Sequence, residues 1–283
     1  MDGIRFEALE NGIGVDTFLR DLARDLKDKT DRAQPVRRVM IPKADGSPRP
    51  LGIPTLRDRV AQMAEKLIIE AIFEADFCEH SYGFRPRRTT HDAMDDIANT
   101  LWAGYTPVIG ADLSKYFDSI PPAKRLAVVA ERMVDGGILP LIKQWLQAPV
   151  IGEDDRGVKK TVGGGKANGQ GTPQGGVISP RLANGYLPIL DRIGQRRHLK
   201  GKLSAPLVRY ADDFVVMCRK EVEEPLKGVR HVLERLDLRL NEAKTPIVDA
   251  TPASFNFPGF TIQMSRGARL ESRTRMSDRR TNR

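Results

Sequence analysis

Apolar residues recur every three or four positions in several stretches of this chain, and this spacing predicts helices. Residues 56–77 are apolar over well more than one helical face, which predicts a buried scaffold helix. The other helical patterns cover residues 13–29, 91–101, 123–147 with a turn at Gly136-Gly137, and 181–193.

Other stretches are rich in β-forming residues and are separated by turn signals. Residues 35–43 and 49–53 flank Asp45-Gly46, a dipeptide typical of tight β-hairpins. Residues 151–170 are rich in Gly and Lys and have no periodicity, so this stretch is expected to be a flexible hairpin or loop.

Three carboxylates stand where buried strands are predicted to end or turn. Residues 207–218 read as two short apolar strands with Asp212 and Asp213 at the tip between them, and the apolar run 108–111 ends at Asp112. Adjacent carboxylates repel one another and lose hydration unless positive charge faces them. Two Mg²⁺ ions, about 3.5–4 Å apart in two-metal sites, would satisfy such a set, and Leu113 would add a main-chain carbonyl. The alternative is an exposed Asp-Asp turn.

Several side chains are candidates for contact with a nucleotide. Lys43 and Arg49, on opposite arms of the first predicted hairpin, would clamp a triphosphate, or else are ordinary exposed charges. Phe117 would lie under the sugar and exclude a 2′-hydroxyl, the alternative being a core aromatic. Gln174 lies in a glycine-rich turn and offers both a donor and an acceptor to a nucleotide or template.

The net charge of +9 is unevenly placed along the chain. The last 18 residues carry +5 of it, and residues 192–209 hold six Lys or Arg and no acid. Arg57 stands at a helix start, where the helix dipole favours anions, so it is a candidate for an external anionic partner. Arg85 lies in a turn with two aromatic residues that would form a platform for a template. The alternatives are a solvated helix face and a loop that packs its own aromatics.

Composition narrows the class of protein. At 283 residues the chain is long enough for one large domain or two modest ones. Cys78 and Cys218 both stand in apolar contexts, so a disulfide framework is not expected and a reducing compartment fits. No apolar run approaches ~18 residues, and the N-terminus is acidic rather than basic. We therefore expect a soluble cytoplasmic protein without a membrane partner.

Six segments in order carry a resemblance to a known family. They read RRVMIPKADGSPRPLGIPTLRDR, EADFCEHSYGFRP, ADLSKYFDSI, GTPQGGVISPRLAN, RYADDFVV and FPGFTI. Over residues 36–262 the chain thereby resembles the fingers and palm of group II intron-encoded reverse transcriptases.

The resemblance implies an α/β (α+β) fold, namely right-hand polymerase fingers and palm with a small antiparallel sheet backed by helices. It implies two Mg²⁺ ions, replaceable by Mn²⁺, and a template RNA that runs past Arg57 and Arg85. The implied partners are an RNA template, a DNA or RNA primer, dNTPs and intron RNA. By matching position, the implied site residues are the catalytic metal ligands Asp112, Asp212 and Asp213, the triphosphate-binding Lys43 and Arg49, the sugar gate Phe117, and the pocket-lining Gln174 and Gly175.

The domain organisation follows from the same resemblance. The expected parts are an N-terminal helical extension at 1–34, fingers at 35–106 with part of them returning within 120–175, a palm at 107–263, and a basic, disordered tail at 264–283. Pro258 stands where the family usually has Leu. A thumb is expected to be absent, so a thumb-bearing partner acting in trans is also expected.

The expected activity is RNA-directed DNA polymerisation on a group II intron-like retroelement. The alternatives are a thumb-less RNA-binding maturase-like protein and an inactive truncated remnant. An RNA-templated RNA polymerase is disfavoured by Phe117.

Overall fold

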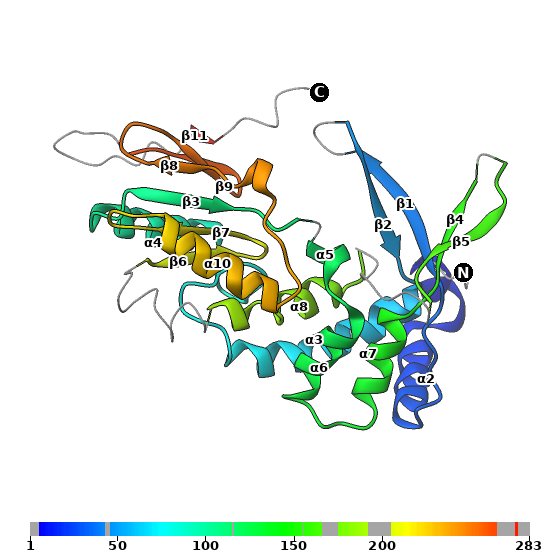
Figure 1. Ribbon diagram of the computed structural model, residues 1–283. Coiled ribbons are helices and arrows are strands. Elements are labelled where there is room, and N and C mark those ends of the chain that lie inside the picture. The colour runs from blue at the N-terminus through cyan, green and yellow to red at the C-terminus, as the bar shows by residue number, and fades with distance from the viewer. Residues whose placement is uncertain are drawn as a thin grey trace. The chain divides into compact units, whose positions relative to one another are not determined.

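The structure is a computed structural model that describes residues 6–42, 46–114, 116–154, 156–165, 175–191, 205–264 and 275–276 (Figure 1). The chain folds as two units. Unit 1 is made of residues 1–75 and 117–186, and unit 2 is made of residues 76–116 and 187–283. Helix α5 (Tyr116–Ser119) begins where the chain passes from unit 2 back into unit 1.

Unit 1 combines helices with one four-stranded sheet. Its sheet has the strand order β2-β1-β4-β5, in which β1 and β4 are parallel and the other neighbours are antiparallel. The strands are β1 (Val36–Pro42), β2 (Pro48–Ile53), β4 (Val150–Glu153) and β5 (Lys159–Gly163). The helices are α1 (Phe6–Ala8), the π-helix η1 (Leu9–Ile13), α2 (Val15–Lys27), α3 (Leu56–Glu74), α6 (Pro122–Ala130), α7 (Ile138–Leu146) and α8 (Ser179–Asn184).

One buried carboxylate joins three parts of unit 1. The hydroxyl of Thr55 caps the start of α3 and also donates to Asp58 Oδ2 over 2.7 Å. The backbone N–H of Gln34 donates to the same oxygen, and Trp145 Nε1 on α7 donates to Oδ1. Burial raises the pKa of Asp58, but these donors satisfy both of its oxygens. The start of α3, the segment before β1 and helix α7 are thus fixed together.

Unit 2 is built on a second four-stranded sheet with the order β6-β7-β3-β8, all antiparallel. A smaller sheet has the order β11-β10-β9. The strands are β3 (Pro107–Ala111), β6 (Leu207–Tyr210), β7 (Asp213–Met217), β8 (Ile247–Asp249), β9 (Phe255–Phe257), β10 (Phe260–Ile262) and β11 (Arg275–Met276). The helices are α4 (Thr90–Trp102), α10 (Glu223–Arg235) and the 3₁₀-helix η2 (Glu242–Lys244).

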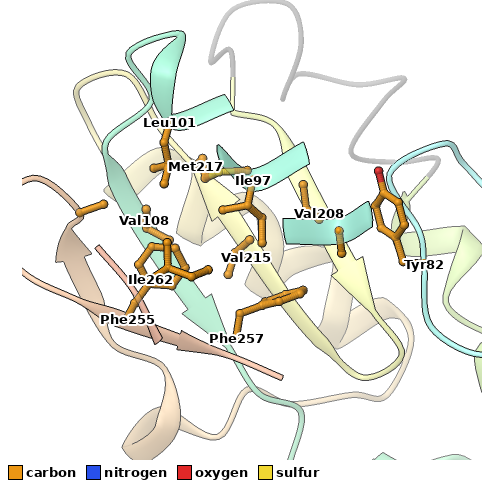
Figure 2. Close-up of a cluster of buried hydrophobic side chains, with 12 residues drawn as sticks. Tyr82, Ile97, Leu101, Val108, Val208, Val215, Met217, Phe255, Phe257 and Ile262 are labelled. Carbon is orange, nitrogen blue, oxygen red and sulfur yellow. The ribbon is translucent and has the colours of Figure 1, made fainter. Parts of the chain in front are cut away.

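The core of unit 2 lies between α4, the four-stranded sheet and the β9–β10 hairpin (Figure 2). Val215 and Met217 point to one face of β7 because side chains two residues apart share a face. Phe214 and Val216 point to the other face and are equally buried. Strand β7 is therefore covered on both faces, which explains why its sequence is a continuous apolar run rather than an alternating one. The side chains of the cluster that are labelled in Figure 2 are Tyr82, Ile97, Leu101, Val108, Val208, Val215, Met217, Phe255, Phe257 and Ile262.

The predicted α/β (α+β) architecture, a small antiparallel sheet backed by helices, is confirmed. The stretch at 151–170, left open between a hairpin and a loop, contains the β4–β5 hairpin. The single helix predicted over 181–193 is wrong, because α8 ends at Asn184 and a second helical stretch covers 188–191. Pro188 has no N–H to donate to the carbonyl of Asn184, so one continuous helix cannot form.

Two further findings bear on the ends of the chain and on membranes. Strand β11, from the segment expected to be a disordered tail, pairs with Phe260 and Thr261 of β10. Among the described residues, no helix has both the length and the apolar character needed to span a bilayer.

The core cluster yields a prediction about stability. Ile97 on α4 is fully buried in it, so Ile97→Ala should lower the free energy of unfolding by about 2–5 kcal/mol through lost burial and a cavity. Urea unfolding followed by circular dichroism measures this. Leu67→Ala on α3 is the control, because Leu67 is 65% exposed. Equal losses in the two variants would show that the cluster does not carry the stability of unit 2.

Candidate active site

The loop that joins β6 to β7 carries two of the predicted acids. Tyr210 pairs with Asp213, so Ala211 and Asp212 form a two-residue hairpin loop. Ala211 has a φ of +60° and Asp212 has a negative φ, which is the type II′ pattern usually built with Gly at the first position. A residue other than glycine at such a positive φ costs about 1–3 kcal/mol. The predicted placement of Asp212 and Asp213 at the hairpin tip is confirmed.

The third predicted acid lies at the same end of the sheet. Strands β3 and β7 are antiparallel, and their last pair is Ala111 with Phe214. Asp112 follows Ala111 and Asp213 precedes Phe214, so the two acids are at adjacent ends of neighbouring strands. The sheet therefore gathers carboxylates that are about a hundred positions apart in the sequence.

The electrostatics of this cluster are unfavourable in the absence of added positive charge. Burial raises the pKa of Asp213 to about 7, and the charges of Asp212 and Asp112 contribute to the increase. Lys244 acts in the opposite direction. At neutral pH, Asp213 is thus divided between its protonated and ionised forms, and a cation at this place would favour the ionised form.

A segment not singled out from the sequence braces Asp112. Asn241 Nδ2 donates to Asp112 Oδ2 over 3.3 Å, and Lys244 Nζ lies 3.8 Å from the same oxygen. The backbone is also joined, because Asn241 N donates to Asp112 O and Ser114 N donates to Arg239 O. The local sequence gave no strong signal for these residues, since Asn241 and Lys244 form an ordinary polar turn after a helix.

Leu113 forms an isolated antiparallel bridge with Leu240, and its side chain is buried. The two hydrogen bonds of this bridge use the carbonyl of Asp112 and the N–H of Ser114. The bridge therefore leaves out the carbonyl of Leu113. The role of that carbonyl as a metal ligand stays a prediction.

The donor set fits a hard divalent cation in its chemistry, since carboxylate oxygens are the ligands that Mg²⁺ and Mn²⁺ prefer. Within the described ranges, no group of three or more His, Cys, Asp or Glu side chains is already arranged to hold a metal ion. The carboxylates interact electrostatically without forming a closed set of ligands.

Two of the predicted nucleotide-binding residues are placed on or against strand β2 of unit 1. Gly175 has a φ of +115°, and a Cβ there would lie 2.6 Å from the carbonyl oxygen of Gly52 on β2. Arg49 is on the same strand, opposite Ile41 of β1. Gly175 thus packs on the strand that carries Arg49, at a position that only glycine fits without strain.

The remaining nucleotide-binding candidates are not placed. Lys43 and Gln174 lie outside the residues that the structure describes. The backbone of Phe117 is part of α5, but its side chain is outside the description as well. Their roles stay predictions.

Arg57 and Arg85 are engaged within the protein. Arg57 donates to Asp25 and Asp31, each over 2.8 Å, so the positive charge at the start of α3 is matched internally. Arg85 donates to the carbonyls of Cys78 and Ser81 over 2.7 and 2.6 Å. These contacts fix the protein's own loops, and the template contact of both arginines stays a prediction.

One residue of the basic run at 192–209 lies inside the protein. Arg209 is fully buried and forms an ion pair with Asp191, so it does not belong to an exposed basic surface. Residues 192–204 lie outside the described ranges.

Comparisons with known sequences agree on one family. The profile described as reverse transcriptase (RNA-dependent DNA polymerase) matches residues 41–262. Protein YkfC of Escherichia coli K12 is 36% identical over 87% of this chain and 71% of its own length. The group II intron-encoded protein LtrA of Lactococcus lactis is 32% identical over 77% of this chain and 34% of its own length. An uncharacterised 91 kDa protein in the cob intron of Schizosaccharomyces pombe is 33% identical over 73% and 24%. The chain thus spans only a quarter to a third of these two intron proteins.

Solved structures share the fold at low sequence identity. Telomerase from Candida albicans with a TWJ fragment of telomeric RNA matches with a TM-score of 0.62 and 16% identity, over 88% of this chain and 47% of that one. Telomerase from Candida tropicalis with the same kind of fragment matches with a TM-score of 0.62 and 14% identity, over 94% and 49%.

The raised pKa of Asp213 predicts how stability depends on pH. The carboxyl group of Asp213 keeps its proton up to about pH 7 in the folded state, but it releases the proton near its ordinary pKa of 3.8 in the unfolded state. The free energy of unfolding therefore falls as pH rises from 3.8 to about 7, because the unfolded state ionises first. In EDTA, the melting temperature of the wild type relative to Asp213→Asn should fall between pH 4 and pH 8.

Melting curves of both proteins at several pH values check this. The comparison is needed because burial also raises the pKa of Asp58 and Glu65, and those contributions are present in both proteins. A constant difference between the two proteins across the window would contradict the assignment.

Proposed function

Because the chain belongs to the reverse transcriptase (RNA-dependent DNA polymerase) family, we propose that it adds dNTPs to the 3′-hydroxyl of a DNA or RNA primer on an RNA template. The predicted resemblance to group II intron-encoded reverse transcriptases is confirmed by the similarity to LtrA and other intron proteins. The right-hand polymerase fold is confirmed by the similarity to telomerase. The observation that carries the proposal is the convergence of Asp112, Asp212 and Asp213 at one end of one sheet.

The family uses divalent metal ions, and we assign two Mg²⁺ ions, replaceable by Mn²⁺, to the three carboxylates and the carbonyl of Leu113. When bound, such ions activate a 3′-hydroxyl and offset charge on the leaving pyrophosphate. The contribution of the protein is to hold the carboxylates together before any cation binds. Lys244 and Asn241 keep Asp112 in place during that time.

The nucleotide is assigned to the β1–β2 hairpin and the loop that packs on it. Arg49, with Lys43 on the other arm, binds the triphosphate, and the backbone at Gly175 approaches the nucleotide beside Gln174. Phe117 excludes the 2′-hydroxyl. The packing of Gly175 on the strand of Arg49 supports this assignment.

The unit boundaries support a division into fingers and palm. Residues 117–186 group with residues 1–75 in unit 1, which supports the return of the fingers within 120–175. Helix α4 packs on the sheet that carries the acids, so we place residues 76–106 with the palm rather than with the fingers. Intron RNA as a partner and a cytoplasmic location are parts of the same proposal.

The acidic cluster favours a polymerase over a protein that only binds intron RNA. Phosphate binding requires positive charge, and a half-buried cluster of repelling carboxylates would weaken it. Stability weighs against an inactive remnant, because acids that repel one another and bind no cation only lower the stability of the fold.

The first prediction concerns the metal ligands. Asp212→Asn should lower the rate of primer extension on an RNA template with Mg²⁺ by about 10³-fold or more, because the neutral amide offsets no cation charge. Asp16→Asn, an exposed acid on α2, should leave the rate unchanged. Extension by Asp212→Asn at the wild-type rate would refute the assignment.

The second prediction concerns sugar selection. Phe117→Ala should lower the ratio of kcat/KM for dNTP over rNTP by about tenfold or more, because the side chain no longer excludes the 2′-hydroxyl. Single-nucleotide incorporation with both substrates measures the ratio. Trp102→Ala, a change at an exposed aromatic at the end of α4, is the control, and unchanged selection in Phe117→Ala would remove the gate role.

A further inference from the structure

Arg209, on β6 three residues before Asp212, is a buried charge held at several points. Its side chain is completely inaccessible to solvent. Nε and one terminal nitrogen donate to the two carboxylate oxygens of Asp191 over 2.8 and 2.5 Å. The same terminal nitrogen donates to the hydroxyl of Ser81 over 2.6 Å.

The other terminal nitrogen of Arg209 reaches the hairpin loop itself. It donates to the carbonyl oxygen of Ala211 over 3.0 Å. That carbonyl belongs to the peptide group whose N–H is that of Asp212, so the bond fixes the plane of the peptide that leads into Asp212. Ala211 is the loop residue with positive φ, and the orientation of the peptide after it separates one turn type from another.

The partner of Arg209 is also held firmly. Asp191 is only 6% exposed and lies in the helical stretch that begins at Pro188. Burial alone lowers the pKa of Arg209, but the carboxylate of Asp191 outweighs this and the pKa is raised. The guanidinium therefore keeps its charge inside the core.

A second segment presses on the loop next to Arg209. Tyr82 N donates to Arg209 O and Arg209 N donates to His80 O, so Ser81 forms an isolated parallel β-bridge with Arg209 and the segment at 80–82 lies beside β6. A Cβ on Gly83 would lie 2.2 Å from Ala211 N. The segment therefore touches the backbone of the loop at a position where no side chain fits.

This segment is itself tied to α4. Tyr82 donates its hydroxyl proton to Asp96 over 2.9 Å, and His80 Nδ1 lies 2.7 Å from the same carboxylate oxygen. The loop thus rests on a rigid support that extends from Asp96 through residues 80–83 to Arg209 and Asp191.

We propose that Arg209 is a positioning residue that holds the Ala211–Asp212 peptide in the one orientation that directs Asp212 toward Asp112 and Asp213. Asp191 and Ser81 fix the guanidinium, and Gly83 lets the supporting segment reach the loop. The inference rests on the proposed function for the role of Asp212, but the support itself is a property of the metal-free protein.

The geometry requires arginine rather than any cation. The planar guanidinium donates in three directions at once, to Asp191, Ser81 and Ala211, whereas an ammonium group is a compact charge on a flexible stem. Lysine at this position would keep the ion pair with Asp191 and lose the bond to Ala211. Arg209→Lys therefore separates positioning from charge.

The test uses the full chain and two readouts that do not depend on catalysis. Hydrogen exchange followed by mass spectrometry should show amides 211–214 of Arg209→Lys exchanging about tenfold faster, with β3 protected as in the wild type. The Mn²⁺ concentration that half-saturates the protein, measured from the free-ion EPR signal, should rise about tenfold. Arg125→Lys, a change at an equally buried arginine on α6 of unit 1, should leave both readouts at wild-type values.

The outcomes separate this inference from the proposed function. If folded Arg209→Lys shows wild-type hydrogen exchange and wild-type Mn²⁺ binding, the positioning role is overturned. This holds even if the wild type extends a primer and Asp212→Asn does not. If amides 211–214 exchange faster in Arg209→Lys and the wild type extends no primer, the support is upheld and the polymerase assignment is refuted. If Arg209→Lys does not fold, Ser81→Ala decides. It removes one of the bonds to the guanidinium, so a smaller change in the same direction supports the role, and no change overturns it.

Discussion

The mutual repulsion of three carboxylates at one end of the palm sheet is the constraint on which the rest of unit 2 depends. Asp112 comes from β3, and Asp212 and Asp213 come from the β6–β7 hairpin, so only the pairing of β3 with β7 brings them together. Burial of Asp213 increases the repulsion, because less water is present to screen it. The packing of β7 on both faces resists the separation of the strands. The core therefore supplies the stability that the acidic cluster reduces.

The hairpin loop also contains a backbone conformation that is unfavourable for folding, and contacts with surrounding residues stabilise it. Ala211 adopts a φ that glycine adopts more easily, and the buried arginine bonds to its carbonyl. A buried ion pair stabilises little by itself, because both ions lose hydration. Its value here is geometric, since bonds from one guanidinium to three groups leave the loop peptide little freedom to rotate.

Local chemistry explains which features could be predicted from the sequence. The helical period of α3 and α4, the apolar run of β7 and the acids at strand ends are all expressed within a few consecutive residues. The break after Asn184 could have been predicted from Pro188. The side-chain partners of Arg57, Arg209 and Asp112 could not, because each lies 18 or more positions away in the chain. A charged residue has the same appearance in a sequence whether it faces water or a buried counter-charge, so nothing in the basic run at 192–209 marks Arg209 as buried.

The two units show this difference in opposite ways. In unit 1, Arg57 was a candidate for binding an external anion, but it forms ion pairs with Asp25 and Asp31. These ion pairs join segments of unit 1 to one another. In unit 2, the described cation that acts on Asp213 is Lys244, whose side chain is 71% exposed and lies 3.8 Å from Asp112. An exposed lysine is a weak counter-charge because water screens it. A fold that pairs Arg57 and Arg209 with acids inside the protein, and sets Asp213 beside two other negative charges, maintains at Asp213 an attraction for cations from solution.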